Sequence, residues 1–450
     1  MRYRTMGFRT GMKVLVKQLG EAIIVKLTGD GALVRLVTPA GLTIKQSYDN
    51  ITAIDEENEV PPMPPPMRAV VEMDKFQQVK ALEALRFGLV PESHLECLTV
   101  GYQDMVRWIG NCLPTRECRI HEICGPFGTG KSHTMAVVRQ IALDQGYLAA
   151  KIEIDGKSNN FSAPQRLLYN IWLSLEGKGL SLETPLLDIY LKAMQNGYDS
   201  IPQPLKDLDY FPVNFDFIRK LKTSQQIEGS AHLLEECLAG SENVSATQVK
   251  ADLAKETSLK RAHINFKPMI AKGARDKLIM FIMSLAGHAV LAKAAGYQGL
   301  ILTIDEFEAH HLLSSPDRAK ARELISVLEH YVSQDFCIPP APLAIFIGAV
   351  SQDGHKGDPW IEKLVDKSGG KQYFLNPWSD AQKEQLANSI FNLYQSTYQI
   401  SAGYDHGLID KTQMLLESRE QSDLVRAFIK YYMAVLDNEY GPGRSRTSDH

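Results

Sequence analysis

The sequence predicts an α/β protein: a parallel β-sheet with a C-terminal helical segment, preceded by a small all-β unit. Strand-like and helix-like segments alternate from residue 119 onward, which is typical of a parallel sheet with crossover helices. A glycine-rich octapeptide separates the first of these strands from the first helix, and a later apolar strand ends in two acids. A proline-rich stretch divides this region from the short apolar runs that precede it.

The composition is that of a globular chain with more than one domain. The 450 residues exceed one ordinary domain. Hydrophobic residues make up 44% and charged residues 23%, which excludes collagen-like, coiled-coil-only and largely disordered chains. The net charge of −4 does not favour coating nucleic acid through bulk charge, and leaves only local basic patches for that role.

Nothing in the sequence predicts secretion or a membrane location. The six cysteines form no CxxC pair, so we expect reduced thiols in a cytoplasmic protein. The basic start has no apolar core behind it, so we do not expect it to act as a signal peptide. His288 and Lys293 interrupt the apolar segment 278–295, which we interpret as a buried helix.

Residues 1–55 predict a small β-barrel. Glycine, proline, aspartate and asparagine turns separate five short apolar runs. The runs are Val14–Val16, Ile23–Leu27, Leu33–Val37, Leu42–Ile44 and Ile51–Ile54. The pattern resembles SH3- or Tudor-like barrels. The unit is mildly basic, with eight Lys/Arg against four acids.

The remaining domain limits follow from breaks in composition and periodicity. Residues 56–67 hold three acids and five prolines and predict an extended linker. We expect a nucleotide-binding domain over 68–378, with a helical insertion around 158–280. A lid of three amphipathic helices is predicted over 379–440, and a disordered tail over 441–450.

The strongest motif is a phosphate-binding loop. Its residues fit G-x-x-x-x-G-K-[ST] at every fixed position: Gly125, Pro126, Phe127, Gly128, Thr129, Gly130, Lys131 and Ser132. Backbone N–H groups of such a loop and the following helix N-terminus surround phosphate oxygens. We expect Lys131 to reach the β- and γ-phosphates of ATP and Ser132 to bind Mg²⁺, with His133 next to them among the cofactor-binding residues.

The segment 299–306 supplies the acids that an ATPase needs. It is an apolar strand that ends in Asp305 and Glu306. We expect Asp305 to hold Mg²⁺ and Glu306 to orient and polarise the attacking water. A strand that ends in solvated acids is the alternative, and the upstream loop disfavours it. The pair is typical of the additional-strand class of P-loop NTPases.

Two further residues are candidates for sensing the nucleotide. The strand Leu343–Val350 ends in Ser351 and Gln352, of which one would sense the γ-phosphate; a polar loop start is the alternative. Arg426 lies at the start of the third lid helix and resembles a sensor-2 arginine; a solvated helix arginine is the alternative. This order of strands, sensor and lid resembles the AAA+ family.

The segment before the loop resembles the BREX-system ATP-binding family, the BrxD-like P-loop proteins of bacterial phage-defence islands. The matching stretches are Glu83–Pro91 and Leu98–Gly101, followed by the phosphate loop. The resemblance implies ATPase activity in a defence complex that acts on DNA, with a helicase or methyltransferase as companion. In AAA+ proteins this segment lines the adenine pocket, which makes Arg86, Gly88 and Gly101 candidates for contacts with the base.

One departure from the AAA+ pattern concerns the arginine finger, which assemblies of this kind contribute from a neighbouring subunit. No arginine occurs between Glu323 and Ser418. Lys367, Lys371, Arg318 or Arg322 could substitute. A homo-oligomer remains possible, but the usual geometry of hydrolysis across subunits is in doubt.

Two minor signals complete the list of candidates. Segment 260–277 holds six cationic residues against Asp276 and is, with the barrel, the best candidate for non-specific DNA contact; a solvated helix face or partner surface is the alternative. His310 and His311, with Glu308 nearby, could bind a metal, but a surface pair is favoured.

The sequence leaves three functions open. The first is an ATP-hydrolysing motor or switch in a phage-defence complex on DNA. The second is a nucleotide-gated module that binds DNA or a partner with little turnover. The third is a DNA-loading ATPase of the transposition or origin type.

Overall fold

The computed structural model divides the chain into two units, Met1–Met73 and Asp74–His450. In the first unit it describes the backbone of five strands. In the second it describes residues 75–441 except 115, 156, 158, 208–217, 219–220, 222–228, 242–243, 258–273, 334–339, 352–357 and 418–424. The predicted linker 56–67 and nearly all of the predicted tail lie outside the described residues.

The first unit is an antiparallel sheet in which each strand pairs with its neighbour in the order β4-β3-β2-β1-β5. The strands are β1 (Lys13–Val16), β2 (Gly20–Thr28), β3 (Gly31–Leu36), β4 (Thr43–Ser47) and β5 (Ile51–Ala53). They follow the five predicted apolar runs, while the assignment to SH3- or Tudor-like barrels stays a prediction.

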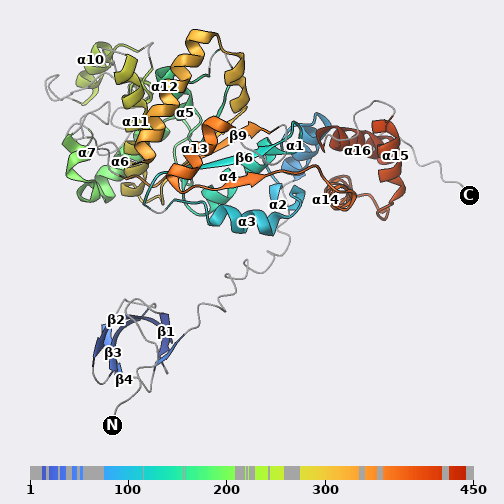
Figure 1. Ribbon diagram of the computed structural model, residues 1–450, viewed down its shortest axis with the longest axis horizontal. Helices are drawn as coiled ribbons and strands as arrows, with labels where there is room; N and C mark the ends of the chain where they lie inside the picture. The colour runs from blue at the N-terminus through green and yellow to red at the C-terminus, as the bar shows by residue number, and fades with distance from the viewer. Residues whose placement is uncertain are drawn as a thin grey trace, which may run out of the picture. The chain divides into compact units, whose positions relative to one another are not determined.

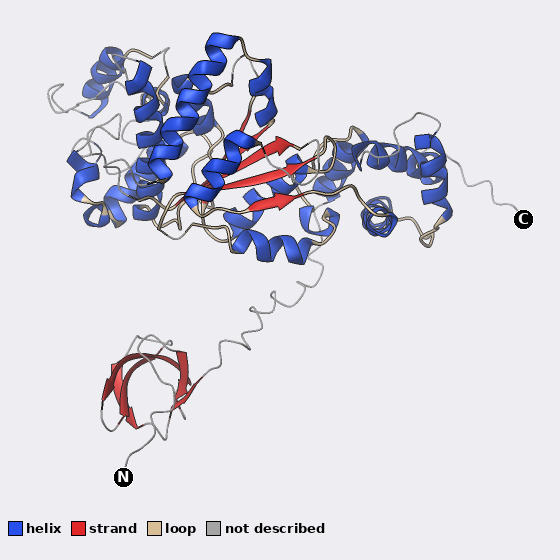
Figure 2. Cartoon of the chain, viewed as in Figure 1, coloured by secondary structure: helices blue, strands red, loops and turns tan. Residues whose placement is uncertain are grey.

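The second unit is built on a five-stranded parallel sheet, as predicted (Figure 2). Its strands are β6 (Arg119–Gly125), β7 (Leu148–Glu153), β8 (Leu300–Asp305), β9 (Leu343–Val350) and β10 (Gln372–Phe374). The strand order is β10-β6-β9-β8-β7, so β9 lies between the strand of the phosphate loop and the strand of the acidic pair. The assignment to the additional-strand class stays a prediction, and this strand order agrees with it.

Helices cover both faces of this sheet (Figure 1). Alternate strand residues point to opposite faces, so Ile301 and Leu302 belong to two different apolar clusters. One face packs against α3 (Tyr102–Gly110) and α4 (Lys131–Asp144). The other packs against α11 (Ala274–Ala294), α12 (Ser315–Val332) and α13 (Pro359–Ser368).

The regular elements described within region 158–280 are helices joined by loops. They are α5 (Pro164–Leu173), α6 (Pro185–Asn196), η3 (Tyr198–Ser200), α7 (Gln203–Asp207), α9 (Ala231–Ala239), α10 (Ala246–Thr257) and the start of α11. The predicted buried helix is α11, whose His288 is buried and bonded to Tyr190 at 3.2 Å. In the described chain, every helix is too short or too polar to cross a membrane.

The C-terminal region forms the three predicted lid helices: α14 (Asp380–Tyr398), α15 (Gly407–Glu417) and α16 (Val425–Tyr440). A capping box between Ser379 and Gln382 starts α14. The helix α1 (Lys75–Arg86) shares its core with the lid, because Leu82 and Leu85 are buried in the same cluster as Phe391 and Phe428. Sequence reasoning placed α1 with the sheet domain, but its apolar face is buried against α14 and α16 instead.

Candidate functional site

The predicted phosphate loop connects β6 to α4, at the carboxyl edge of the parallel sheet. Gly128 and Gly130 have φ of 80° and 104°, in the left-handed region that residues with a side chain rarely adopt. These dihedrals turn the loop tightly into the first turn of α4, whose backbone N–H groups have no partner within the helix. The loop therefore has the conformation that an anion site requires.

Lys131 and Ser132 are the first residues of α4. The Lys131 ammonium donates hydrogen bonds of 3.3 Å to the carbonyl oxygens of Gly125 and Pro126, so the side chain folds over its own loop. The Thr129 hydroxyl donates a bond of 2.8 Å to the same Pro126 oxygen. Lys131 is buried, and a bound phosphate would give its ammonium a charged acceptor in place of two carbonyls.

The two acids lie at the end of β8, which is separated from β6 only by β9. One carboxylate oxygen of Asp305 accepts a 2.9 Å bond from the backbone N–H of Glu306. Glu306 itself has a left-handed backbone, with φ of 55° and ψ of 38°. A strained non-glycine residue of this kind is characteristic of functional sites.

Burial raises the pKa of Glu306 above its usual range, and the negative charges of Glu308 and Asp305 act in the same direction. The Lys131 ammonium opposes this effect. A carboxylate with a raised pKa is a better proton acceptor than an ordinary glutamate. The carboxylate of Glu306 is thus suited to take a proton from water beside the phosphate loop.

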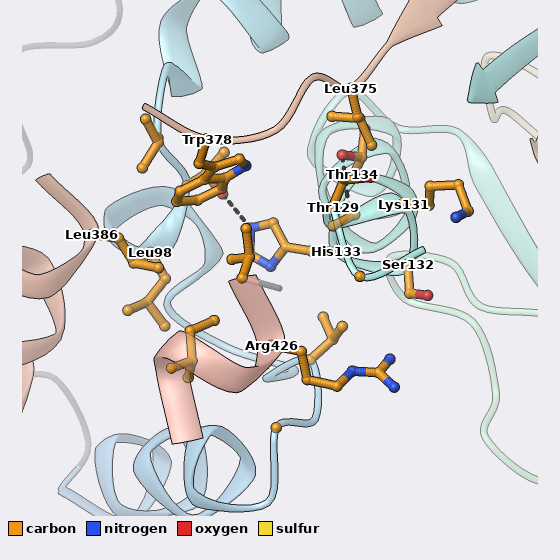
Figure 3. Close-up of a pocket in the computed structure, with 18 of the residues that line it drawn as sticks. Leu98, Thr129, Lys131, Ser132, His133, Thr134, Leu375, Trp378, Leu386 and Arg426 are labelled. Carbon is orange, nitrogen blue, oxygen red and sulfur yellow. Dashed lines mark hydrogen bonds between the residues drawn. The ribbon is translucent and has the colours of Figure 1, made fainter. Parts of the chain in front are cut away.

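The phosphate loop, Glu306 and the lid line one cavity of about 250 Å³. Figure 3 shows the loop and the lid on its two sides. Its polar end holds Phe127 to Thr134 and Glu306. Its other walls come from residues 85–105, from residues 373–386 and from the start of α16. The apolar side chains among them include Leu85, Leu89, Val90, Leu98, Met105, Trp378, Leu386 and Ile429.

His133 lies between the polar and apolar parts of this cavity (Figure 3). Its Nε2 is 2.7 Å from the Thr99 hydroxyl, which itself donates to the carbonyl oxygen of Leu95 at 2.6 Å. The hydroxyl proton is committed to Leu95, so Nε2–H must donate to Thr99. Burial lowers the pKa of His133 to about 4, which keeps the ring neutral and leaves Nδ1 as a hydrogen-bond acceptor.

Arg426 lies in the first turn of α16 and lines the cavity from the lid side. Its guanidinium carbon is 5.7 Å from the centre of the Phe127 ring, on the phosphate loop. Gly88 lines the same wall, and a Cβ atom there would lie 3.0 Å from Cγ of Arg426. The lid arginine therefore approaches the phosphate loop, as a sensor-2 arginine would.

The structure places two of the predicted base-contacting residues elsewhere. Arg86 is outside the cavity lining, and its guanidinium makes two 2.7 Å bonds to Asp437 and one of 3.1 Å to the Tyr398 hydroxyl. These partners raise the pKa of Arg86 beyond its usual value. Gly101 precedes α3 and is also outside the lining. Arg86 joins α1 to the lid, because its partners lie on α14 and α16.

The sensor candidate after β9 is only partly described. Ser351 is 3% exposed, and its backbone N–H donates a 3.1 Å bond to the Gly125 carbonyl. It therefore lies beside the phosphate loop but outside the cavity lining. Gln352 lies outside the described residues.

The candidate finger residues that are described contact their own subunit. Arg318 donates to the carbonyls of His311 and Leu313, Arg322 stacks at 5.0 Å from the centre of the Trp360 ring, and Lys367 bonds Glu329. Lys371 immediately precedes β10 and is exposed. The basic segment 260–277 lies outside the described residues, apart from the backbone of the first turn of α11.

Sequence reasoning missed Thr99 and Trp378. Thr99 lies within the stretch Leu98–Gly101 but was given no role there, and Trp378 immediately precedes the capping box of α14. A polar residue facing a helix-start histidine has no local signature, because residues 99 and 133 meet only in the folded chain. A tryptophan just before a strong helix start could have been proposed as a wall of the cavity.

Comparison with known proteins gives a family match that includes the phosphate loop. Residues 74–175 match the family model of the BREX system ATP-binding protein BrxC/D. A search of curated proteins finds no match. Among solved structures, the Aeropyrum pernix ORC1 protein in complex with DNA matches with a TM-score of 0.29 and 12% identity. That match covers 77% of this chain and 64% of the ORC1 chain, less than two thirds of its length, and it is too weak to bear on function.

The matched span runs from α1 through the phosphate loop and α4 to α5. It includes the stretches 83–91 and 98–101 on which the resemblance was based. The resemblance recognised from the sequence is therefore confirmed over residues 74–175, which are similar to the BREX system ATP-binding protein BrxC/D family.

Proposed function

We propose that this protein binds ATP with Mg²⁺ in the cavity between the phosphate loop and the lid, and hydrolyses it as an AAA+-like switch or motor of a BREX-type phage-defence complex. One observation carries the proposal: Lys131, Ser132 and Glu306 line the same cavity, together with Arg426 from the lid. A phosphate-binding cation, a hydroxyl ligand for Mg²⁺ and a proton acceptor thus converge on one site.

The phosphate end binds the charged part of the nucleotide. The loop N–H groups and the α4 N-terminus bind phosphate oxygens, while the Lys131 ammonium moves from the Gly125 and Pro126 carbonyls to the β- and γ-phosphates. Ser132 and Asp305 fit Mg²⁺, because hydroxyl and carboxylate oxygens are the ligands that this ion prefers. Bound Mg²⁺ would neutralise the charge that develops on the phosphates.

Glu306 accepts a proton from the attacking water. Its raised pKa has a testable sign: the carboxylate is protonated, and lost as a base, at a higher pH than an ordinary glutamate. The rate of hydrolysis should therefore fall on acidification at a pH above the usual range of glutamate. Ser351, beside the loop through its bond to Gly125, is the proposed sensor of the γ-phosphate.

The other end of the cavity recognises adenine. The apolar walls from residues 85–105 and from Trp378 would cover the base. The acceptor Nδ1 of His133 could receive a hydrogen bond from the exocyclic amino group of adenine, whereas guanine carries a carbonyl oxygen at that position. This arrangement favours ATP over GTP.

A second function, a nucleotide-gated binding module with little turnover, is supported by the contacts of the finger candidates. Arg318, Arg322 and Lys367 all contact groups of their own chain, so among the described candidates only the exposed Lys371 is left for hydrolysis across subunits. DNA binding through segment 260–277, and a helicase or methyltransferase as companion, remain parts of the proposal that rest on the sequence.

The proposal is tested by phosphate release from the Glu306→Gln variant. The substitution keeps the size and polarity of the side chain but removes the proton acceptor, so turnover should fall roughly 10²–10⁴-fold while ATP still binds. Glu323→Gln is the matched control, because Glu323 is an exposed acid of α12 outside the cavity lining, whereas Glu308, on η6 (Phe307–Leu312), raises the pKa of Glu306. Equal turnover in the wild type and Glu306→Gln would remove Glu306 from the mechanism.

The same assay separates the two candidate functions. A motor or switch should release phosphate faster when DNA is added, and a salt series should weaken DNA binding steeply because phosphate contacts release counterions. ATP binding with negligible turnover, with and without DNA, would favour the gated module instead.

A further inference from the structure

Three side chains with metal-binding groups converge outside the nucleotide cavity. His310 and His311 belong to η6, and Asp358 is the N-cap residue of α13. One ligand atom from each residue lies within 4.8 Å of the other two. Nε2 of His311 is 3.8 Å from one carboxylate oxygen of Asp358. The cluster thus joins two elements that are distant in the sequence.

His310 has the arrangement of a metal-ligating histidine. Its side chain is fully buried, and its Nδ1 is 2.6 Å from the Phe307 carbonyl oxygen. Nδ1 must donate that bond because a carbonyl only accepts, so in the neutral ring the lone pair is on Nε2. Nε2 is buried and has no hydrogen-bond partner within the described residues. A backbone carbonyl that fixes one ring nitrogen while the other faces the ion is the usual support of a histidine ligand.

Asp358 is held in place by two bonds that leave one of its oxygens for a ligand. One carboxylate oxygen accepts a 2.8 Å bond from the Trp360 N–H. Its own backbone N–H donates a 2.7 Å bond to the Glu122 side chain, on the strand of the phosphate loop. The second carboxylate oxygen is the one that faces His311. Asp358 is only 8% exposed, so this negative charge is kept in a largely dry setting.

Aromatic rings surround His310, and one nearby cation, Arg318, opposes the binding of a metal ion. The rings of Phe307 and Trp360 lie 4.6 and 4.3 Å from the His310 ring. Burial lowers the pKa of His310, and the nearby Arg318 cation acts weakly in the same direction and would also repel a metal ion. The guanidinium bonds the carbonyls of His311 and Leu313, so it is turned to the backbone rather than to the imidazoles. The carboxylate of Asp358 offsets its charge.

We propose that His310, His311 and Asp358 form a binding site for a transition metal ion, with Zn²⁺ as the ion that the ligands suit best. Two neutral imidazoles and one carboxylate are ligands that Zn²⁺ accepts, and a tetrahedral ion would keep a fourth position for water or a partner's side chain. Ligands about 2 Å from such an ion lie about 3.3 Å apart. The 4.8 Å cluster must contract, and His311, whose side chain is 62% exposed, can make that movement.

The position of the metal site would let a bound ion link two segments of the second unit. The segment η6 begins directly after Glu306, and Asp358 is bonded to Glu122 of β6. A bound ion would therefore tie the segment that follows the acidic pair to the strand that leads into the phosphate loop. The proposal does not require ATP hydrolysis, since the ion would bind the chain without nucleotide.

Metal binding to nucleotide-free, full-length protein without a histidine tag tests the site. After removal of metals with a chelator and dialysis, Zn²⁺ titration calorimetry should give one ion per chain. Replacement by Co²⁺ should produce the intense visible absorption of a tetrahedral ion. His311→Ala should weaken binding at least about ten-fold, because it removes one of three protein ligands.

Three further variants make the test specific. His310→Gln should also weaken binding, with circular dichroism to verify folding; if it misfolds, the exposed His311 position decides alone. His406→Ala removes an exposed histidine of the lid and should leave binding unchanged. Asp305→Asn should also leave it unchanged, which separates this site from the Mg²⁺ site. No Zn²⁺ uptake by the wild type, or equal affinity in folded His311→Ala, would overturn the proposal.

Discussion

The two ends of the cavity differ in how the chain builds them. The phosphate end comes from consecutive residues, 127–134, with Glu306 at the tip of a nearby strand. The base end is assembled from three distant segments, in the ranges 85–105, 373–386 and 425–429. A short sequence motif forms the phosphate end, whereas the base end forms only when α1 packs against the lid.

This difference shows which contacts depend on the lid. The apolar cluster shared by α1, α14 and α16 fixes the base end, and the Arg86–Asp437 pair closes the same interface. Lys131 and Glu306 are positioned by the sheet and its loops instead. Variants at the phosphate end should therefore affect binding and chemistry, while variants at the lid interface should affect stability first.

Lys131→Ala should have the largest effect on ATP affinity. It removes the buried ammonium that pairs with the phosphates, and charge-assisted bonds of this kind contribute about 1.5–3 kcal/mol, or roughly 10–150-fold in affinity. Titration calorimetry with ATP measures it. Lys320→Ala, at an exposed surface ion pair, is the control and should bind like the wild type. Unchanged affinity in Lys131→Ala would place the phosphates elsewhere.

Arg86→Ala and Asp437→Ala should each lower the free energy of unfolding by about 1–3 kcal/mol, since each leaves a partly buried charge without its ion-pair partner. The double variant should cost much less than the sum of the two, because both single variants break the same pair. Urea denaturation of the four proteins completes the cycle. Additive effects on stability would show that Arg86 and Asp437 do not act as a pair. A loss of ATP affinity in Arg86→Ala alone would instead indicate that Arg86 contacts the base.

His133→Ala should have the smallest effect, and it should appear as lost discrimination. Removing one hydrogen bond of about 1 kcal/mol should reduce the preference for ATP over GTP by roughly five-fold. Competition between the two nucleotides measures this ratio directly. Thr99→Val should act in the same direction, because it frees the ring that Thr99 orients. If both variants kept the wild-type ratio, the base end would not read adenine through His133.

The sequence predicts the phosphate end well for a physical reason. The octapeptide, the strand before it and the strand that ends in Asp305 and Glu306 are each recognisable within a few residues. The parallel sheet then brings their carboxyl ends to one edge. The lid helices were also predictable, since their amphipathic periodicity and the capping box at Ser379 are local signals.

The base end could not be predicted in the same way. Arg86 lies near the cavity in the sequence pattern, but its partner Asp437 is 351 residues away, and only the packed lid shows that they pair. The same holds for Asp358, which faces the two histidines of η6 from the start of another helix. Contacts between distant segments have no periodicity or spacing that a single sequence reveals.

A structure of Glu306→Gln with ATP and Mg²⁺ bound tests the central claim most directly, because this variant should retain the nucleotide. We predict the triphosphate on residues 125–132, with Lys131 on the β- and γ-phosphates and Arg426 turned toward them. The adenine should lie against His133, between residues 85–105 and Trp378. A nucleotide bound outside this cavity, or a base that points away from the lid, would contradict the account.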